Sequence, residues 1–138
     1  MVQGYLVISE QGEVRLRKEA GSTTLTIKGA GTLSRPEENY LLESNAGREL
    51  LWPLIIGASI EKERYRHLSW PHTFEFDVHH GHLEGYICVE VEFDTVEEAK
   101  AFVLPDWIKD AVEVTEDKRY KAKNLAKNHK TIREDLGL

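Results

Sequence analysis

The sequence has one cysteine, no long apolar run and no excess of positive charge, and each absence excludes a class of protein. A lone Cys88 excludes an intrachain disulfide and favours a reducing compartment, so we expect a cytoplasmic protein. No apolar run approaches the roughly 18 residues of a membrane span, and no basic and apolar leader follows Met1, so we expect neither a membrane partner nor a signal peptide. The net charge of −6 argues against binding to a nucleic acid polymer.

The composition that remains is that of an ordinary globular domain. With 138 residues, 41% of them hydrophobic and 30% charged, the chain is long enough to bury one core. No repeat, low-complexity tract or linker divides it. We therefore expect residues 1–138 to form a single domain.

Five segments alternate apolar with charged or polar residues at a period of two, which is the period of a β-strand. They read Val14-Arg15-Leu16-Arg17, Leu25-Thr26-Ile27-Lys28, Ile60-Glu61-Lys62-Glu63-Arg64-Tyr65, Phe74-Glu75-Phe76-Asp77-Val78 and Val89-Glu90-Val91-Glu92-Phe93. In four of the five, one face is apolar and the other is polar or charged. If the apolar faces point outward against helices, the charged faces converge on one central space.

This central space would combine cations for phosphate with carboxylates for a divalent metal. The predicted phosphate ligands on strands and loops are Arg15, Arg17, Lys28, Arg35, Lys62 and Arg64. The predicted metal ligands are Glu37, Glu75, Asp77, Glu90 and Glu92. Glu90 and Glu92 are also the candidate catalytic residues, because a carboxylate beside the metal can orient the attacking water. The alternative is a solvated outer sheet face with cross-strand ion pairs.

The predicted elements are mostly strands, with two or three helices, which indicates an α+β fold built on an antiparallel β-barrel. We predict strands over 5–9, 13–19, 23–28, 35–43, 59–67, 73–79, 85–93 (the longest) and 112–115. We predict helices over 44–55, with Ser44 or Asn45 as the cap, over 96–103 and within the basic segment 117–136. Thr95 followed by Glu98 fits a capping box.

A few other residues could carry chemistry. The run His79-His80-Gly81-His82 could bind a transition metal such as zinc, but an exposed turn is favoured. Cys88 is better explained as a small packing residue than as a nucleophile, because no basic partner is fixed beside it. The tryptophans, which are Trp52, Trp70 and Trp107, are expected to pack helices or cap the barrel.

Eight motifs follow one another along the chain: Gln3-Gly4-Tyr5-Leu6, Val14-Arg15-Leu16-Arg17, Thr26-Ile27-Lys28, Ser34-Arg35-Pro36-Glu37, Glu61-Lys62-Glu63-Arg64-Tyr65, Phe74-Glu75-Phe76-Asp77-Val78 with Gly81, Val89-Glu90-Val91-Glu92-Phe93 and Glu113-Val114-Thr115-Glu116-Asp117-Lys118-Arg119-Tyr120. Their order resembles the CYTH superfamily, also called triphosphate tunnel metalloenzymes. The layout is most similar to short bacterial inorganic triphosphatases.

The resemblance implies a closed tunnel of antiparallel strands that acts on inorganic triphosphate or a nucleoside triphosphate with Mg or Mn. It also implies that Lys118 and Arg119 reach the tunnel mouth as phosphate ligands. Solvation of a helix end is the alternative explanation for these two cations.

The sequence departs from the superfamily in three places. The first strand, which carries Glu-x-Glu-x-Lys, is expected to be missing, an amide (Asn39) replaces one carboxylate, and Ala122 replaces an asparagine. Three hypotheses follow: an active but weakened triphosphatase, a catalytically deficient binding module for polyphosphate or nucleotide, and a barrel whose open edge serves assembly as a homodimer.

Overall fold

The computed structural model describes residues 1–31, 34–126, 133–134 and 136–138. Seven antiparallel strands form one sheet in the order β4-β3-β2-β1-β5-β6-β7. The strands are β1 (Val2–Ile8), β2 (Gly12–Glu19), β3 (Ser22–Gly29), β4 (Glu37–Leu41), β5 (Ile56–Ser69), β6 (His72–His80) and β7 (Ile87–Val91). The helices are α1 (Asn45–Leu51), α2 (Val96–Ala101) and α3 (Ala122–Leu125), with 3₁₀ turns η1 (Trp52–Leu54), η2 (Gly81–Leu83), η3 (Asp106–Ile108) and η4 (Lys118–Tyr120).

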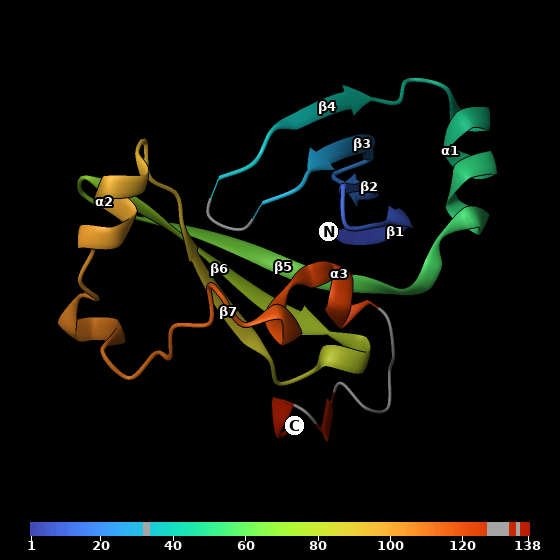
Figure 1. The fold of residues 1–138 in the computed structure, drawn as a ribbon. Helices are drawn as coiled ribbons and strands as arrows, with labels where there is room; N and C mark the ends of the chain where they lie inside the picture. The colour runs from blue at the N-terminus through green and yellow to red at the C-terminus, as the bar shows by residue number, and fades with distance from the viewer. Residues whose placement is uncertain (32–33, 127–132, 135) are drawn as a thin grey trace.

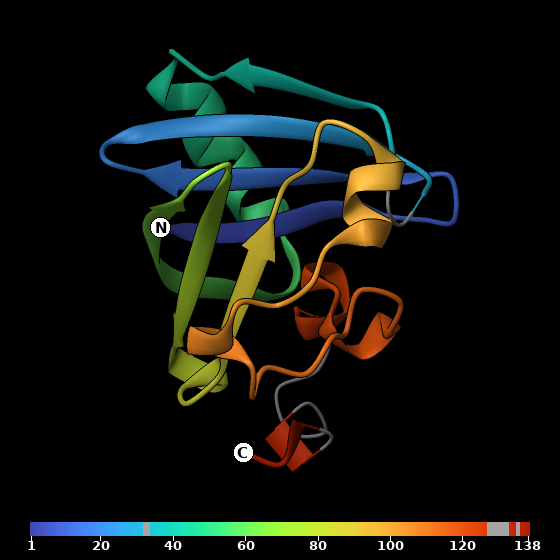
Figure 2. The ribbon, with the colours of Figure 1, turned by 90° about the vertical axis from the view of Figure 1, so that its left-hand side faces the viewer.

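The sheet curls around a central space and forms a half-barrel (Figures 1 and 2). Its two edges are β4 and β7, and neither has a second strand partner among the residues that the structure describes. All five residues of β4 are exposed. The predicted antiparallel barrel with covering helices is therefore confirmed as a curled sheet that is open between β4 and β7.

Two tight turns fix the register of the long hairpins. Glu19 pairs with Ser22 across a two-residue turn, and both residues of that turn have positive φ, 46° at Ala20 and 80° at Gly21. Two successive positive φ angles give the turn a twist that matches the flanking strands. Ser69 pairs with His72 across a second two-residue turn, which contains the cis Trp70–Pro71 bond.

Helical segments cover the convex face of the sheet, where the apolar side chains point. Leu16 and Phe74 are 0% and 1% exposed. The ring of Phe74 packs against Phe102, just after α2, at 6.1 Å and against Trp107 of η3 at 4.9 Å between ring centroids. At the other end of the sheet, Ile55 lies directly over Gly4. A Cβ atom added to Gly4 would be only 2.5 Å from the Ile55 side chain. The outward direction of the apolar faces is thus confirmed.

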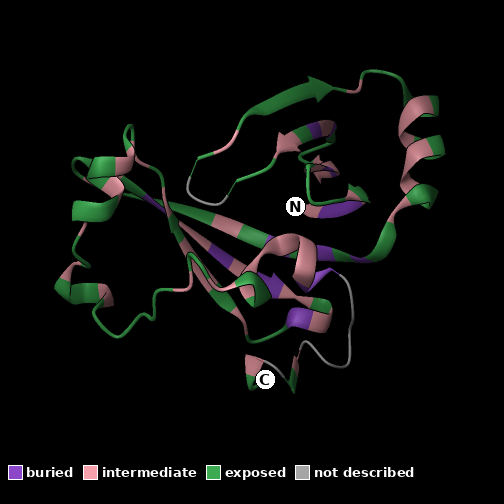
Figure 3. Ribbon diagram, viewed as in Figure 1, coloured by how far each residue is buried: buried purple, intermediate pink, exposed green. Residues whose placement is uncertain are grey.

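The C-terminal segment enters the concave side of the sheet. Leu125 and Ala126 are buried against Tyr5 and Ile60 of the sheet and Leu83 of η2. The Ala58 amide donates a 2.7 Å hydrogen bond to the Ala126 carbonyl oxygen, which ties α3 to β5. Figure 3 shows buried residues where α3 approaches the strands. One part of the concave side is therefore an apolar core, while the rest is left to charged residues.

Most elements lie where the sequence predicts them, and the differences have identifiable causes. The Ser44 hydroxyl caps α1 by accepting from the Gly47 amide, and the helix becomes 3₁₀ at Trp52, the residue before Pro53. The prediction of a strand over 112–115 was wrong, because these residues find no neighbouring strand to pair with. The prediction that 85–93 is the longest strand was also wrong: β5 has 14 residues and β7 has 5. Within 117–136, the helical residues of the described part are η4, α3, 133–134 and 136, and 127–132 and 135 lie outside the described residues.

Two side-chain predictions were wrong as well. His79 is not in an exposed turn: β6 continues through His80, and His79 is 4% exposed on the concave face. Trp70 does not pack, because it is 87% exposed at the tip of the β5–β6 hairpin. Trp107 packs as expected, and the Trp52 ring lies 3.7 Å from the Lys18 ammonium. None of the described helices has the length and apolar character needed to cross a membrane.

Candidate functional site

The register brings most of the predicted charged residues onto one concave face, because directly paired residues point to the same side of a sheet. On that face the cross-strand pairs that join two charged residues are Glu13 with Lys28, Lys28 with Glu37, Arg64 with Asp77, Arg66 with Glu75 and Glu75 with Glu90. Arg15 and Arg17 follow Glu13 at spacings of two on β2. The predicted placement of these charged side chains on one face of the sheet is therefore confirmed. They form two walls, one on β2, β3 and β4 and the other on β5, β6 and β7.

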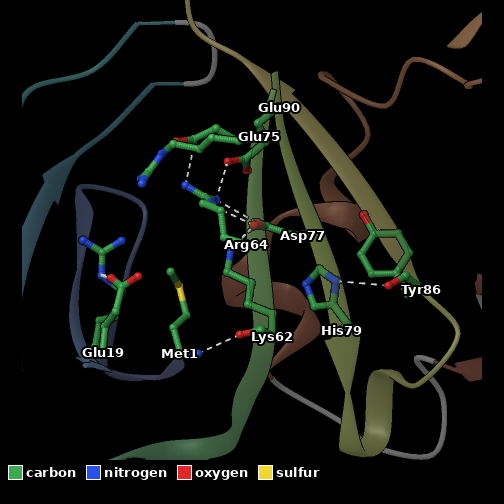
Figure 4. Close-up of polar contacts among 11 residues, drawn as sticks. Met1, Glu19, Lys62, Arg64, Glu75, Asp77, His79, Tyr86 and Glu90 are labelled. Atoms are coloured by element: carbon green, nitrogen blue, oxygen red, sulfur yellow. Dashed lines mark hydrogen bonds and ion pairs between the residues drawn. The ribbon is translucent and has the colours of Figure 1, made fainter. Parts of the chain in front are cut away.

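The wall of β5, β6 and β7 is built around Arg64 (Figure 4). Its Nε and Nη2 donate to the two carboxylate oxygens of Asp77 at 2.6 and 2.7 Å. Nη2 also donates to Glu90 Oε2 at 2.8 Å, and Nη1 donates to Glu75. A guanidinium has five N–H donors, so this network leaves one of them for any ligand. The hydrogen bond to Asp77 raises the pKa of Arg64, and the nearby carboxylates add to that shift.

Asp77 is the buried centre of the same wall, at 1% exposure. It accepts from Lys62 as well as from Arg64. Burial alone would raise the pKa of Asp77, but the hydrogen bonds from Arg64 and Lys62 outweigh burial and hold that pKa below its usual value. Asp77 is therefore a fixed negative charge at the base of the site.

His79 extends this wall toward the apolar core. Its Nδ1 lies 3.2 Å from the Tyr86 carbonyl oxygen, and its ring packs against the Tyr86 ring, tilted by 36°, at 4.7 Å between centroids. Burial lowers the pKa of His79, and the positive charge of Lys62 lowers it further. His79 is accordingly a neutral ring beside a lysine–aspartate pair. Next to it, burial raises the pKa of the Cys88 thiol, which agrees with a packing role.

The wall of β2, β3 and β4 is richer in cations. Lys28 lies 3.0 Å from Glu37, and Asn39 Nδ2 donates to Glu37 at the same distance. Burial would raise the pKa of Glu37, but the bonds from Asn39 and Lys28 lower it. Arg15 hydrogen-bonds the Tyr5 phenol, whose burial raises its pKa to about 12, so the phenol stays protonated. The Arg15 Nε is buried with no hydrogen-bond partner.

Several predicted site residues lie at the margins of these walls. Arg17 has a 3.9 Å ion pair with Glu19. Glu92 lines a hollow of about 320 Å³ together with Glu75, beside Asp94 and Glu98. Lys118 is exposed, and Arg119 donates to Asp117, with its Nη2 at 2.6 Å. Within the part of the chain that the structure describes, the ion pairs of the two walls include neither Lys118 nor Arg119.

Four residues of the concave face were missed from the sequence. Glu13 is 4% exposed and contacts Arg35 and Lys123. Arg66 Nε donates to Glu75 at 2.8 Å. Glu13 lies two residues before Arg15, and Arg66 lies two residues after Arg64. The same alternation, extended by one position on the charged face, would therefore have found both. His79 lies on the same charged face as Asp77 within the predicted strand 73–79, but it was assigned to an exposed turn, whereas the position of Lys123 depends on where α3 docks.

The donor set of the acidic wall has the chemistry that Mg²⁺ or Mn²⁺ requires. Among the described residues, no three histidine, cysteine or acidic side chains are arranged to hold a metal ion by themselves. Mg²⁺ usually binds only one or two protein carboxylates and takes its other ligands from water and substrate phosphates. Glu75 and Glu90 form a cross-strand pair on the concave face and can supply those two carboxylates. The residues present therefore fit such an ion as one that binds together with its substrate.

Comparison with known proteins places this architecture in a family. No family model matches the chain. The inorganic triphosphatase of Nitrosomonas europaea is 43% identical over 126 residues, which span 90% of this chain and 82% of that protein. The chain belongs to the inorganic triphosphatase family.

Two further comparisons agree with this membership. The inorganic triphosphatase of Acetivibrio thermocellus is 37% identical over 127 residues, covering 91% of this chain and 79% of the relative. The crystal structure of the inorganic triphosphatase NE1496 superposes with a TM-score of 0.64 at 40% identity, covering 92% of this chain and 84% of that one. The curled sheet is thus the fold of this triphosphatase family.

Proposed function

We propose that this protein hydrolyses inorganic triphosphate in the concave side of its sheet. The observation that carries the proposal is the pair of facing walls, one rich in cations and one rich in carboxylates. A linear triphosphate needs both, because its oxygens must be neutralised while a water is placed in line for attack. The activity named for relatives at 43% and 37% identity supports the same substrate.

The cations of the first wall are the best placed to bind phosphate oxygens. Arg15 keeps a buried Nε without a hydrogen-bond partner, and the ion pair of Arg17 is long at 3.9 Å. Lys28 and Arg35 complete this group. Arg64 has one N–H left, so its larger role is to hold Asp77, Glu75 and Glu90 in place.

The second wall would hold a divalent metal and orient water. We assign Glu75 and Glu90 as protein ligands of Mg²⁺ or Mn²⁺, with Asp77 and Glu92 adjoining them and Glu37 on the opposite edge strand. When bound, such an ion neutralises charge on the phosphoryl oxygens. The exposed carboxylates Glu90 and Glu92 are the candidates to accept a proton from the attacking water.

We also propose that the chain is a triphosphate tunnel metalloenzyme of the CYTH type. A curled sheet with a charged concave face supports this assignment. The described residues depart from the superfamily in one respect, since they do not include its Glu-x-Glu-x-Lys strand. The unpaired edges of β4 and β7 support pairing with a strand from a second copy, as in a homodimer.

A phosphate-release assay on tripolyphosphate tests the function. We expect turnover with Mg²⁺ or Mn²⁺ and none after chelation, with ATP as the competing nucleotide substrate. The double variant Glu90→Gln/Glu92→Gln should lose activity, while Glu43→Gln/Glu49→Gln, at two exposed positions beside and in α1, should retain it. Equal activity in the two variants, or the absence of any turnover by the wild type, would overturn the proposal.

A further inference from the structure

Glu13 is a buried carboxylate on the concave face that the proposed chemistry does not use. It is 4% exposed, and its two oxygens face cations from different parts of the chain. Arg35, in the connection from β3 to β4, donates from Nη2 to Glu13 Oε1 at 3.4 Å. Lys123 of α3 places its ammonium 3.4 Å from Glu13 Oε2. One side chain of β2 thus joins a loop and the C-terminal segment.

The surroundings of Glu13 carry an excess of positive charge. Lys28 is its direct cross-strand partner, and Arg15 follows it at a spacing of two on the same face. Lys28 is already paired with Glu37 at 3.0 Å. Without a carboxylate at Glu13, these cations would repel one another and their side chains would move toward solvent. Glu13 is therefore the counterion around which this end of the cationic wall is arranged.

The two ion pairs of Glu13 leave donors available to a ligand. Both span 3.4 Å, whereas the bonds of Arg64 to Asp77 measure 2.6 and 2.7 Å. Lysine has three N–H donors and arginine five. Lys123 is half-buried on the concave side, unlike the exposed Lys118 of the preceding turn.

We propose that Glu13 is a positioning residue for Arg35 and Lys123, and that Lys123 is a phosphate-binding residue supplied by the C-terminal segment. The inference rests on the proposed function, since it assigns a further contact to the same triphosphate. It gives α3 a role in binding in addition to filling the apolar core.

A purely electrostatic effect and a positioning role predict opposite changes in the affinity of Glu13→Gln for tripolyphosphate, so the measurement distinguishes between them. Removal of a negative charge from the site should by itself tighten the binding of an anion. Loss of the counterion that holds Arg35 and Lys123 should weaken it. A residue that served the fold alone would lower the melting temperature and leave the affinity of the folded protein unchanged.

The experiment is calorimetric titration of tripolyphosphate into the wild type and four variants, with thermal melts as the check on folding. We expect Lys123→Ala to raise the Kd about tenfold, the usual effect of one lost hydrogen bond to a charged group. We expect Glu13→Gln to raise the Kd as well, and Lys123→Arg to restore most of the affinity. Lys100→Ala, an exposed lysine of α2 on the convex side, is the matched control and should bind as the wild type does.

Each result decides one claim. If Glu13→Gln binds tripolyphosphate as tightly as the wild type or more tightly, the positioning role is overturned. If Lys123→Ala matches Lys100→Ala, the phosphate contact of Lys123 is overturned. A wild type that binds tripolyphosphate without hydrolysing it would instead refute the proposed activity and leave this inference standing. A wild type that does not bind it would refute both.

Discussion

Arg64 lies in a field of negative charge, because its guanidinium donates to Asp77, Glu75 and Glu90. The three carboxylates come from β6 and β7, and Arg64 contacts all of them, while Lys62 also pairs with Asp77 and Arg66 with Glu75. Arg17 differs, since its one ion pair with another described residue is the long contact of 3.9 Å to the half-exposed Glu19. Both arginines lie on the charged face of their strands, yet the structure gives them different energetic roles.

The first prediction compares the two arginines by stability. Arg64→Ala should lower the free energy of unfolding by about 3 kcal/mol, because it leaves half-buried and buried carboxylates facing one another. Arg17→Ala should cost less than about 1 kcal/mol, as for an exposed ion pair. Urea denaturation at neutral pH measures both. Equal midpoints for the two variants would show that Arg64 does not organise the acidic wall.

The second prediction concerns His79 and acid. In the unfolded chain its pKa is near 6.5, while burial and Lys62 lower it in the native state. The unfolded state therefore binds the proton more readily, so the stability that His79 contributes is complete above pH 6.5 and is lost as the pH falls below it.

His79→Phe should reduce the loss of melting temperature between pH 7 and pH 5 while keeping the ring contact with Tyr86. His80 is partly exposed beside Glu63 and Glu84, and these partners raise its pKa, so its contribution runs the other way in both proteins. A variant with the same pH dependence as the wild type would mean that His79 is protonated without cost.

At the scale of elements, strand alternation carried most of what the sequence could predict. The period of two along each strand places Arg15, Lys28 and Glu75 on the charged face of their strands, and this inference needs no knowledge of the tertiary fold. The segment 112–115 has the same apolar and polar alternation but forms no strand, because a strand needs a partner edge and the sequence does not say which edges are available. The position of Lys123 depends on how α3 docks, which is a tertiary contact.

The third prediction tests the convex face. Phe74 is 1% exposed and contacts Phe102 and Trp107, so it joins β6 to the segments that cover it. Phe74→Ala should cost about 3–5 kcal/mol, the usual cost of removing a buried phenyl ring. Tyr65 of β5 lies on the same face of the sheet but is 56% exposed. Tyr65→Ala should therefore cost under about 1 kcal/mol. Urea denaturation followed by tryptophan fluorescence measures both, and a harmless Phe74→Ala would mean that the convex face is not a core.

At the scale of the whole molecule, the half-barrel has two edges whose backbone groups can pair with another strand. The β4 edge is the more accessible, since all five of its residues are exposed, including Tyr40 at 50% and Leu41 at 62%. Proteins usually protect such edges with lysine, proline or a covering segment. The sequence of β4 is Glu37-Glu38-Asn39-Tyr40-Leu41 and contains neither lysine nor proline.

The fourth prediction is that the protein associates through β4 as a two-fold dimer at micromolar concentration. Antiparallel pairing of β4 with its copy about Asn39 would place Glu38 opposite Tyr40 and avoid a direct contact between like charges. Tyr40→Glu should shift the equilibrium toward monomer, because in this register it places a second carboxylate directly opposite Glu38 of the other copy, and like charges at directly paired positions repel. Sedimentation equilibrium across a hundredfold range of concentration measures the shift, and Ile87→Glu on the β7 edge is the matched control. A wild type that stays monomeric over that range, or an Ile87→Glu variant that dissociates while Tyr40→Glu does not, would rule out β4 as the interface.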